Sequence, residues 1–289
     1  MSSNNSVNLA NSCIHCLHGK MHRLPFPSSR FVANSPFELV HTNLWGPAPL
    51  DSINGYKYYV IFVDHFTRFT WLYLLTNKSE VYSKFVMFHA MVKIQFSSTI
   101  KVLRLDWGGE YTSKSFESFL SSNGIHHQIS CPYTPQQNDL VERKHRHLIK
   151  TTITLLSQAS LPSTYWSFTV QFALTLINLL PTATLDFLSP WFKFHGQHPN
   201  IFSLKIFGCA CYPFFRPYNQ HKLNHKTTEC IFLLIYSLTN CIPAGMYCLM
   251  RTGSLFLPHL LLPHLLNHLL QTYGCPIYCT STFPISPLF

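Results

Sequence analysis

Two acidic residues have surroundings typical of a metal-dependent phosphoryl-transfer site. Asp106 follows the short apolar run VLRL and precedes Trp-Gly-Gly, and Glu142 lies in the segment QQNDLVERKHRHL, which is predicted to enter a long helix. Two-metal phosphoryl transfer requires carboxylates that converge on ions about 3.5–4 Å apart, and Mg²⁺ prefers hard oxygen ligands. The alternative is a pair of unrelated surface acids, and the spacing alone leaves both interpretations open.

The segment around Glu142 also carries amide and basic side chains. Asn138, Glu142 and Arg146 are spaced four residues apart, so a helix places them on one face. A carboxylate beside cationic and amide donors can hold a metal ion next to a nucleic-acid backbone, whereas the simpler interpretation is a solvated basic helix. The residues predicted to contact DNA are Asn138, Arg143, Lys144, Arg146 and Lys150.

The composition favours a polyanionic partner. The chain of 289 residues has 21 Lys and Arg against 11 Asp and Glu, a formal net charge of +10, and only 11% charged residues, where ~25% is usual. Such a balance suits nucleic acid or an anionic membrane surface. The N-terminal segment is polar and no run reaches ~18 apolar residues, so neither a secretory signal nor a membrane span is predicted. The ten cysteines lack the density of a secreted disulfide scaffold.

The order of the predicted elements indicates an α/β fold. β-branched and aromatic runs at 57–66 and 68–75 predict a hairpin, and apolar residues at helical spacing predict a helix within 78–96. With a first strand that reaches Asn43, the order β-β-β-α-β-α-β-α is typical of a mixed five-stranded sheet flanked by helices. The remaining elements are predicted at 100–106 (strand), 115–124 (helix) and 139–157 (helix), and residues 126–138 are predicted to form an irregular loop.

Seven motifs carry a family resemblance: HTNLWGP, YYVIFVDHFTRFTWLYLL, LRLDWGGEY, GIHHQISCPYTPQQNDLVERKHR, LINLLPTATL, FGCACY and CIFLL. In this order they resemble the integrase region of copia-type LTR retrotransposon polyproteins, over residues 13–236. The resemblance implies a ribonuclease-H-like catalytic core that joins element DNA to target DNA by strand transfer dependent on Mg²⁺ or Mn²⁺. It also implies two aspartates and one glutamate as metal ligands, of which Asp106 matches the second aspartate and Glu142 the glutamate.

Asn43 occupies the position of the first aspartate, because HTNLWGP stands where the family has HTD-WGP. An amide oxygen can coordinate Mg²⁺, but it is neutral and does not bridge two cations as a carboxylate does. Since electrostatic stabilisation dominates this kind of catalysis, we expect strand transfer by this copy to be reduced by orders of magnitude. A non-catalytic nucleic-acid-binding relic of an integrase is the alternative function. Of the neighbouring acids, Asp51 is predicted to lie in a loop and Asp64 to cap a turn.

Further departures from the family indicate a truncated and degenerate copy. Trp107 stands where the family usually has asparagine, Asp139 where it usually has glycine, and the tail diverges after residue 236. Cys13 and Cys16 match half of the family's His-His-Cys-Cys zinc site, and no histidine precedes them in this sequence. We therefore expect this half-site not to hold Zn²⁺.

Four regions are predicted along the chain. They are a zinc-knuckle remnant at 1–26, an integrase catalytic core at 27–203, a small β-rich SH3-like segment at 204–250 and a low-complexity tail at 251–289. The expected partners are DNA, as element ends and as target, and further copies of the chain in a homo-oligomer, with no membrane. No targeting signal is visible. The nucleus is expected from the function, and secretion is not.

Overall fold

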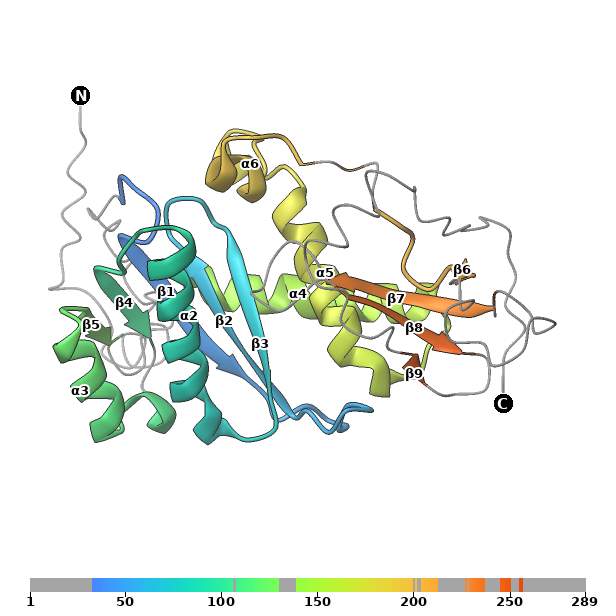
Figure 1. Cartoon of the computed structure of the whole chain (residues 1–289), viewed down its shortest axis with the longest axis horizontal. Coiled ribbons are helices and arrows are strands. Elements are labelled where there is room, and N and C mark those ends of the chain that lie inside the picture. Colours follow the sequence, from blue (N-terminus) through green and yellow to red (C-terminus); the bar gives the residue numbers. More distant parts are fainter. Residues whose placement is uncertain are drawn as a thin grey trace, which may run out of the picture. The chain divides into compact units, whose positions relative to one another are not determined.

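The computed structural model describes residues 33–105, 108–129, 139–199, 201, 204–212, 227, 229–236, 245–250 and 255–256. The chain divides into two units, Met1–Val32 and Ala33–Phe289. All of the described residues belong to the second unit, and its elements are labelled in Figure 1. No helix within these ranges is long and apolar enough to cross a membrane.

A mixed five-stranded sheet forms the centre of the described residues, in the order β3-β2-β1-β4-β5. β1 pairs antiparallel with β2, and β2 antiparallel with β3, whereas β4 runs parallel to both β1 and β5. This topology confirms the predicted α/β fold and the predicted hairpin. The prediction of an irregular loop over 126–138 is wrong at its start, because His126–Ile129 pairs in parallel with β4, a long-range pairing that no local pattern specifies. The strands are β1 (Leu39–Trp45), β2 (Tyr58–Asp64), β3 (Thr70–Leu75), β4 (Val102–Leu105) and β5 (His126–Ile129).

Helices cover both faces of the sheet (Figure 1). One face packs against α2 and α3 in an apolar cluster that includes Phe85 and Phe116. The other packs against α4 and α5 in a cluster that includes Val141 and Val170. The helices are α2 (Val81–Gln95), α3 (Lys114–Ser122), α4 (Asp139–Gln158), α5 (Trp166–Leu179) and α6 (Pro190–His195), with short 3-10 turns at η2 (Lys78–Glu80), η3 (Gly109–Tyr111), η5 (Ser163–Tyr165) and η6 (Ala183–Leu185).

The alternation of side chains along β1 assigns each residue to one of these two faces. Val40 and Leu44 pack in the cluster with α2, whereas Trp45 packs in the cluster with α4 and α5. Because successive side chains of a strand point to opposite faces, His41 and Asn43 lie on the same face as Trp45. We call this the α4 face of the sheet.

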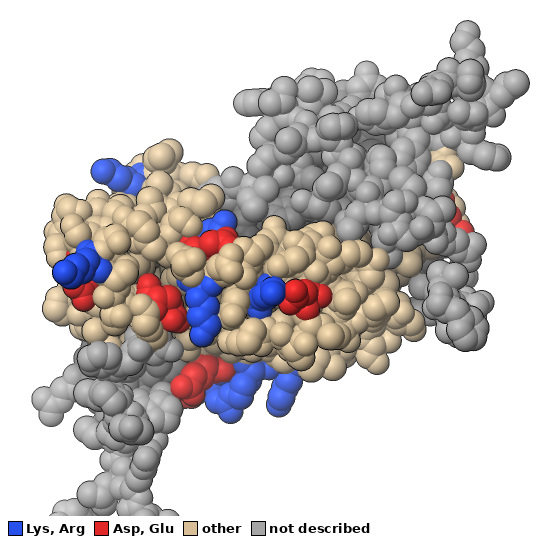
Figure 2. All heavy atoms as spheres, turned by 90° about the horizontal axis from the view of Figure 1, so that it is seen from below, with Lys and Arg blue, Asp and Glu red and all other residues tan. Residues whose placement is uncertain are grey.

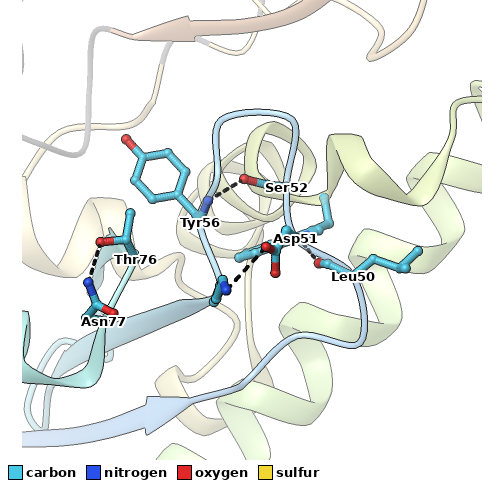
Figure 3. A network of polar contacts seen from close by, with 8 residues as sticks. Leu50, Asp51, Ser52, Tyr56, Thr76 and Asn77 are labelled. Carbon is cyan, nitrogen blue, oxygen red and sulfur yellow. Dashed lines mark hydrogen bonds and ion pairs between the residues drawn. The ribbon is translucent and has the colours of Figure 1, made fainter.

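The loop between β1 and β2 is closed by local contacts, several of which are drawn in Figure 3. The Tyr56 backbone N–H donates to Ser52 Oγ at 2.9 Å, and Trp166 at the start of α5 donates from Nε1 to the Leu50 carbonyl at 3.0 Å. Asp51 lies 3.4 Å from Lys57 Nζ in an exposed ion pair. Asp51 therefore belongs to a surface loop, as predicted.

A second sheet follows the helices, with the order β6-β7-β8-β9 and antiparallel pairing throughout. It packs on α5, where the Phe172 ring lies 6.3 Å from that of Phe232 on β7. The predicted SH3-like segment falls here, and the boundaries of the four predicted regions stay predictions. The strands are β6 (Ala210–Cys211), β7 (Cys230–Tyr236), β8 (Gly245–Met250) and β9 (Leu255–Phe256).

Candidate metal and nucleic-acid site

Asn43 is half-buried on the α4 face of β1, the central strand of the sheet. Its antiparallel partner on β2 is Ile61, whose side chain is fully buried in the cluster with α4 and α5. The Asn43 side chain thus comes from a strand that is paired with β2 at Asn43 itself and with β4 at Leu39–His41. A strand of this kind fixes the direction of a ligand side chain better than a loop does.

Helix α4 approaches β1 at the turn that carries Glu142. His145 is buried on this helix, and its Nδ1 lies 3.1 Å from the Tyr59 hydroxyl on β2. Burial lowers the pKa of His145 to about 4, while an interaction with the Asn43 backbone acts in the opposite direction. Glu142 is half-buried one helical turn before His145. The turn of α4 that bears His145 is therefore packed beside position 43, and Glu142 lies one turn earlier on the same helix.

Several predicted site residues fall outside the described residues. They are Asp106, Trp107, Asn138, Cys13 and Cys16. Strand β4 ends at Leu105, immediately before Asp106, and it lies next to β1 in the sheet. In the parts of the chain that the structure describes, no group of three His, Cys, Asp or Glu residues could hold a metal ion.

A row of polar side chains that the sequence analysis did not single out crosses the α4 face. His41 on β1 and His65 after β2 meet through Nε2 and Nδ1 at 2.9 Å, with the rings stacked 5.1 Å apart. Arg104 on β4 lies opposite His41 in the parallel register. Its guanidinium donates to Gln128 Oε1 on β5 from Nε at 3.2 Å and from an Nη atom at 2.9 Å.

The comparison with known proteins decides the family. Residues 33–135 match the integrase core domain family. The chain is 46% identical over 246 residues to the retrovirus-related Pol polyprotein from transposon RE2 of Arabidopsis thaliana, covering 85% of this chain and 16% of that polyprotein. This region is an integrase core domain of the retrotransposon type. The chain spans about a sixth of the length of that relative.

Solved integrases are also similar to this integrase core. A chain of the simian T-cell lymphotropic virus intasome, solved by cryo-EM in complex with PP2A regulatory subunit B56 gamma, is 19% identical with a TM-score of 0.51, covering 87% of this chain and 86% of that chain. The HTLV-2 integrase catalytic core in complex with magnesium is 17% identical with a TM-score of 0.43, covering 57% of this chain and 100% of that chain. The intasome likeness confirms the ribonuclease-H-like fold.

The exposed cations of the integrase core's α4 are partly neutralised by its first residue. Asp139 lies 3.0 Å from Arg143 and 3.9 Å from Arg146, and both arginine side chains are about two-thirds exposed. Lys150 is exposed farther along the helix. These three residues occupy the outer surface predicted for a nucleic-acid contact.

Lys144 has a different environment from the other predicted DNA-binding residues. Its side chain is half-buried. Burial is the main reason that its pKa falls to about 8, and the Arg68 guanidinium lowers it further. Lys144 is therefore a recessed cation that faces other cations of the integrase core.

Asp64 is a structural residue of the integrase core. Its carboxylate accepts hydrogen bonds from the Phe37 N–H at 2.8 Å, and from the Thr67 N–H at 2.7 Å and hydroxyl at 2.6 Å. Burial raises its pKa, and these hydrogen bonds oppose the rise. The prediction that Asp64 caps a turn is confirmed. Its engaged oxygens make it a poor substitute for a carboxylate at position 43.

Charged side chains of both signs are interspersed on the face of the integrase core drawn in Figure 2, which looks at the molecule from below the view of Figure 1. Blue and red atoms lie next to one another there, separated by wide uncharged areas. The chain's net charge of +10 is therefore not gathered into one continuous basic area on this face.

Proposed function

We propose that this chain is an integrase that joins DNA strands by metal-dependent polynucleotidyl transfer, with activity limited by Asn43. The observation that supports this most directly is the packing of α4 on the strand that carries Asn43. The buried His145 ties this helix to β2, and Glu142 lies one turn away. Asp106, the third proposed ligand, directly follows the neighbouring strand β4.

The donor atoms of the proposed site suit Mg²⁺ or Mn²⁺. The amide oxygen of Asn43 and the carboxylate of Glu142 are hard donors of the kind that these ions bind, and Asp106 would add a second carboxylate. A bound ion would supply Lewis-acid polarisation of a phosphoryl oxygen. The amide at position 43 removes one of three negative charges, so the chain's own residues would hold the ion more weakly.

The remaining residues would act on the DNA itself. Arg146 and Lys150 project from the outer surface of α4, where they can contact phosphates without reading the sequence. Arg143 lies beside them, and its charge is partly neutralised by the ion pair with Asp139. We propose DNA, as element ends and target, as the substrate, a homo-oligomer as the working form and the nucleus as the place of action.

A strand-transfer assay with a labelled donor duplex and Mg²⁺ or Mn²⁺ tests this function. Asn43→Asp should raise the rate by about 10²-fold or more, because it restores a charge at the reacting centre. Glu142→Gln in the Asn43→Asp background should abolish the gain. Asn54→Asp is the matched control, since Asn54 is exposed in the loop between β1 and β2. An Asn43→Asp variant that is folded, binds DNA and stays inert would contradict the proposal.

A non-catalytic nucleic-acid-binding relic is the second candidate function. The neutral amide at position 43 and the net charge of +10 both favour it. Binding driven by phosphate contacts weakens steeply with salt. Salt-sensitive DNA binding together with no strand transfer, in both the unaltered chain and Asn43→Asp, would establish this second function in place of the first.

A further inference from the structure

A set of recessed cations gathers over the polar row on the α4 face. Arg68 lies in the turn after β2, and its φ of 60° is a left-handed backbone conformation. Asp64 stabilises this turn through its hydrogen bonds with Thr67. The Arg68 backbone N–H donates to the Asp64 carbonyl at 3.0 Å. The guanidinium of Arg68 acts electrostatically on His41, His65 and Lys144. The charge of Arg68 is therefore felt on β1, in the turn after β2 and on α4.

Arg104 is the third cation of the set. It lies on β4, which neighbours β1 on the side away from β2. It influences both His41 and His65, and its guanidinium is held toward β5 by Gln128. Arg68, Arg104 and Lys144 are each half-buried, which leaves part of each side chain open to solvent. The His41 and His65 rings, joined through Nε2 and Nδ1 at 2.9 Å, lie on the same face of the sheet as Arg104, which is the partner of His41 in the parallel register.

The cluster carries more positive charge than the described residues neutralise. Among those residues, the ion pairs join Lys57 to Asp51, Lys101 to Glu38, and Asp139 to two arginines. None involves Arg68, Arg104 or Lys144. Asp64 does attract Arg68, but its oxygens accept three hydrogen bonds. Half-buried charges of like sign repel one another in a medium of reduced dielectric constant, so an anion between them would be stabilising.

We propose that Arg68, Arg104 and Lys144 form a receptor for one phosphate group carried by a nucleic-acid strand, with the His41–His65 pair as its floor. Guanidinium groups match the geometry of phosphate oxygens. His41 lies two residues before Asn43 on β1, a distance of about 7 Å along a strand. The receptor would hold a backbone phosphate next to the proposed metal site, and this part of the inference rests on the proposed function.

DNA binding in EDTA tests the receptor without any catalytic step. Fluorescence anisotropy of a labelled duplex over a series of salt concentrations gives both the affinity and its salt dependence. Arg68→Gln, Arg104→Gln and Lys144→Gln should each weaken binding by about 3- to 30-fold and reduce the salt slope by about 0.9, the value for one lost phosphate contact. Lys114→Gln is the matched control, because Lys114 is exposed at the start of α3. Equal affinities and slopes for all four variants would overturn the proposal.

The thermal stability of the same variants separates a binding role from a structural one. In buffer without phosphate, Arg68→Gln should unfold at the same temperature as the unaltered chain or higher, since it relieves repulsion from Lys144. Inorganic phosphate, compared with chloride at equal ionic strength, should raise the unfolding temperature of the unaltered chain and not that of Arg68→Gln.

Two outcomes point to other sources of the effect and overturn the proposal. A response to inorganic phosphate that Arg68→Gln abolishes, with unchanged DNA affinity, would assign the receptor to a free anion. A large fall in the unfolding temperature of Arg68→Gln, with unchanged DNA affinity for Lys144→Gln, would make Arg68 purely structural. Because metal is absent throughout, loss of the proposed strand-transfer function would leave these measurements intact.

Discussion

The two faces of the five-stranded sheet differ in what they bury. On the α2 face, aromatic rings pack on one another, as in the stacked pair of Phe62 and Phe88 with centroids 4.5 Å apart. On the α4 face, the strands present Asn43, the histidine pair and Arg104 beside the apolar cluster. Burying polar groups costs free energy unless they are well paired. Both faces bury apolar side chains, and the polar groups on the α4 face lower the stability that this face gains from burial, in favour of the site that we propose there.

The largest expected effect is the loss of unfolding free energy when a ring is removed from the apolar α2 face. Phe88→Ala should lower the free energy of unfolding by about 3–5 kcal/mol, the usual cost of removing a buried Phe ring, because Phe88 is fully buried between β2 and its own helix α2. Urea denaturation measures the change. Met87→Ala, at the neighbouring and 54% exposed position, should stay within about 0.5 kcal/mol. Equal losses of unfolding free energy in both variants would contradict the packing of Phe88 in the apolar α2 face.

A smaller effect, on the α4 face, depends on pH. The pKa of His145 is about 4 in the folded chain against its ordinary 6.5, so between these values the unfolded chain binds a proton that the folded chain does not. The contribution of His145 to the free energy of unfolding is then fully present above pH 6.5 and is lost as the pH falls toward 4. The loss from this residue is at most about 3 kcal/mol. Unfolding free energies at pH 7.0, 5.5 and 4.5 should show a shallower loss for His145→Asn. An unchanged pH dependence in that variant would remove His145 as the cause.

The smallest effect concerns the hydrogen bond between His145 of α4 and Tyr59 of β2. Tyr59→Phe removes the hydroxyl that lies 3.1 Å from His145 Nδ1, and it should cost about 0.5–1.5 kcal/mol of unfolding free energy. Tyr58→Phe is the matched control one residue away, with its side chain on the other face of the sheet. If Tyr58→Phe loses as much unfolding free energy as Tyr59→Phe, the hydrogen bond of the Tyr59 hydroxyl makes no specific contribution to stability.

Much of the framework could be predicted from the sequence because it depends on local patterns. The β-branched and aromatic runs YYVIFVD and TWLYLL, separated by a tight turn, predicted the hairpin, and the segment after Asp139 was predicted as a helix that ends one residue before the end of α4. The family motifs brought position 43 to notice although an amide stands there. These signals are contained within short segments, so no knowledge of distant contacts was needed.

The recessed cations could not be predicted in the same way. His41 and Arg104 become neighbours only through the parallel register of β1 and β4, which no local pattern specifies. Lys144 was predicted as one more cation of a basic helix, since periodicity gives the face of a residue and not the neighbour that covers it. A signal was nevertheless present: Arg104 is a charged residue at an inner position of an otherwise apolar strand.

Gly208 has a mechanical consequence for the helix that carries Glu142. Its φ is 79°, and a methyl group there would collide with Ala159, the residue just after α4. From Glu142 to Ala159 the chain spans about 25 Å of nearly continuous helix. This helix acts as a stiff rod. Gly208, whose N–H donates to the Phe232 carbonyl of β7 at 2.8 Å, lies against one end, and the proposed ligand Glu142 lies near the other. Any bulk added at position 208 would push on the rod, so a change remote from the chemistry could displace Glu142.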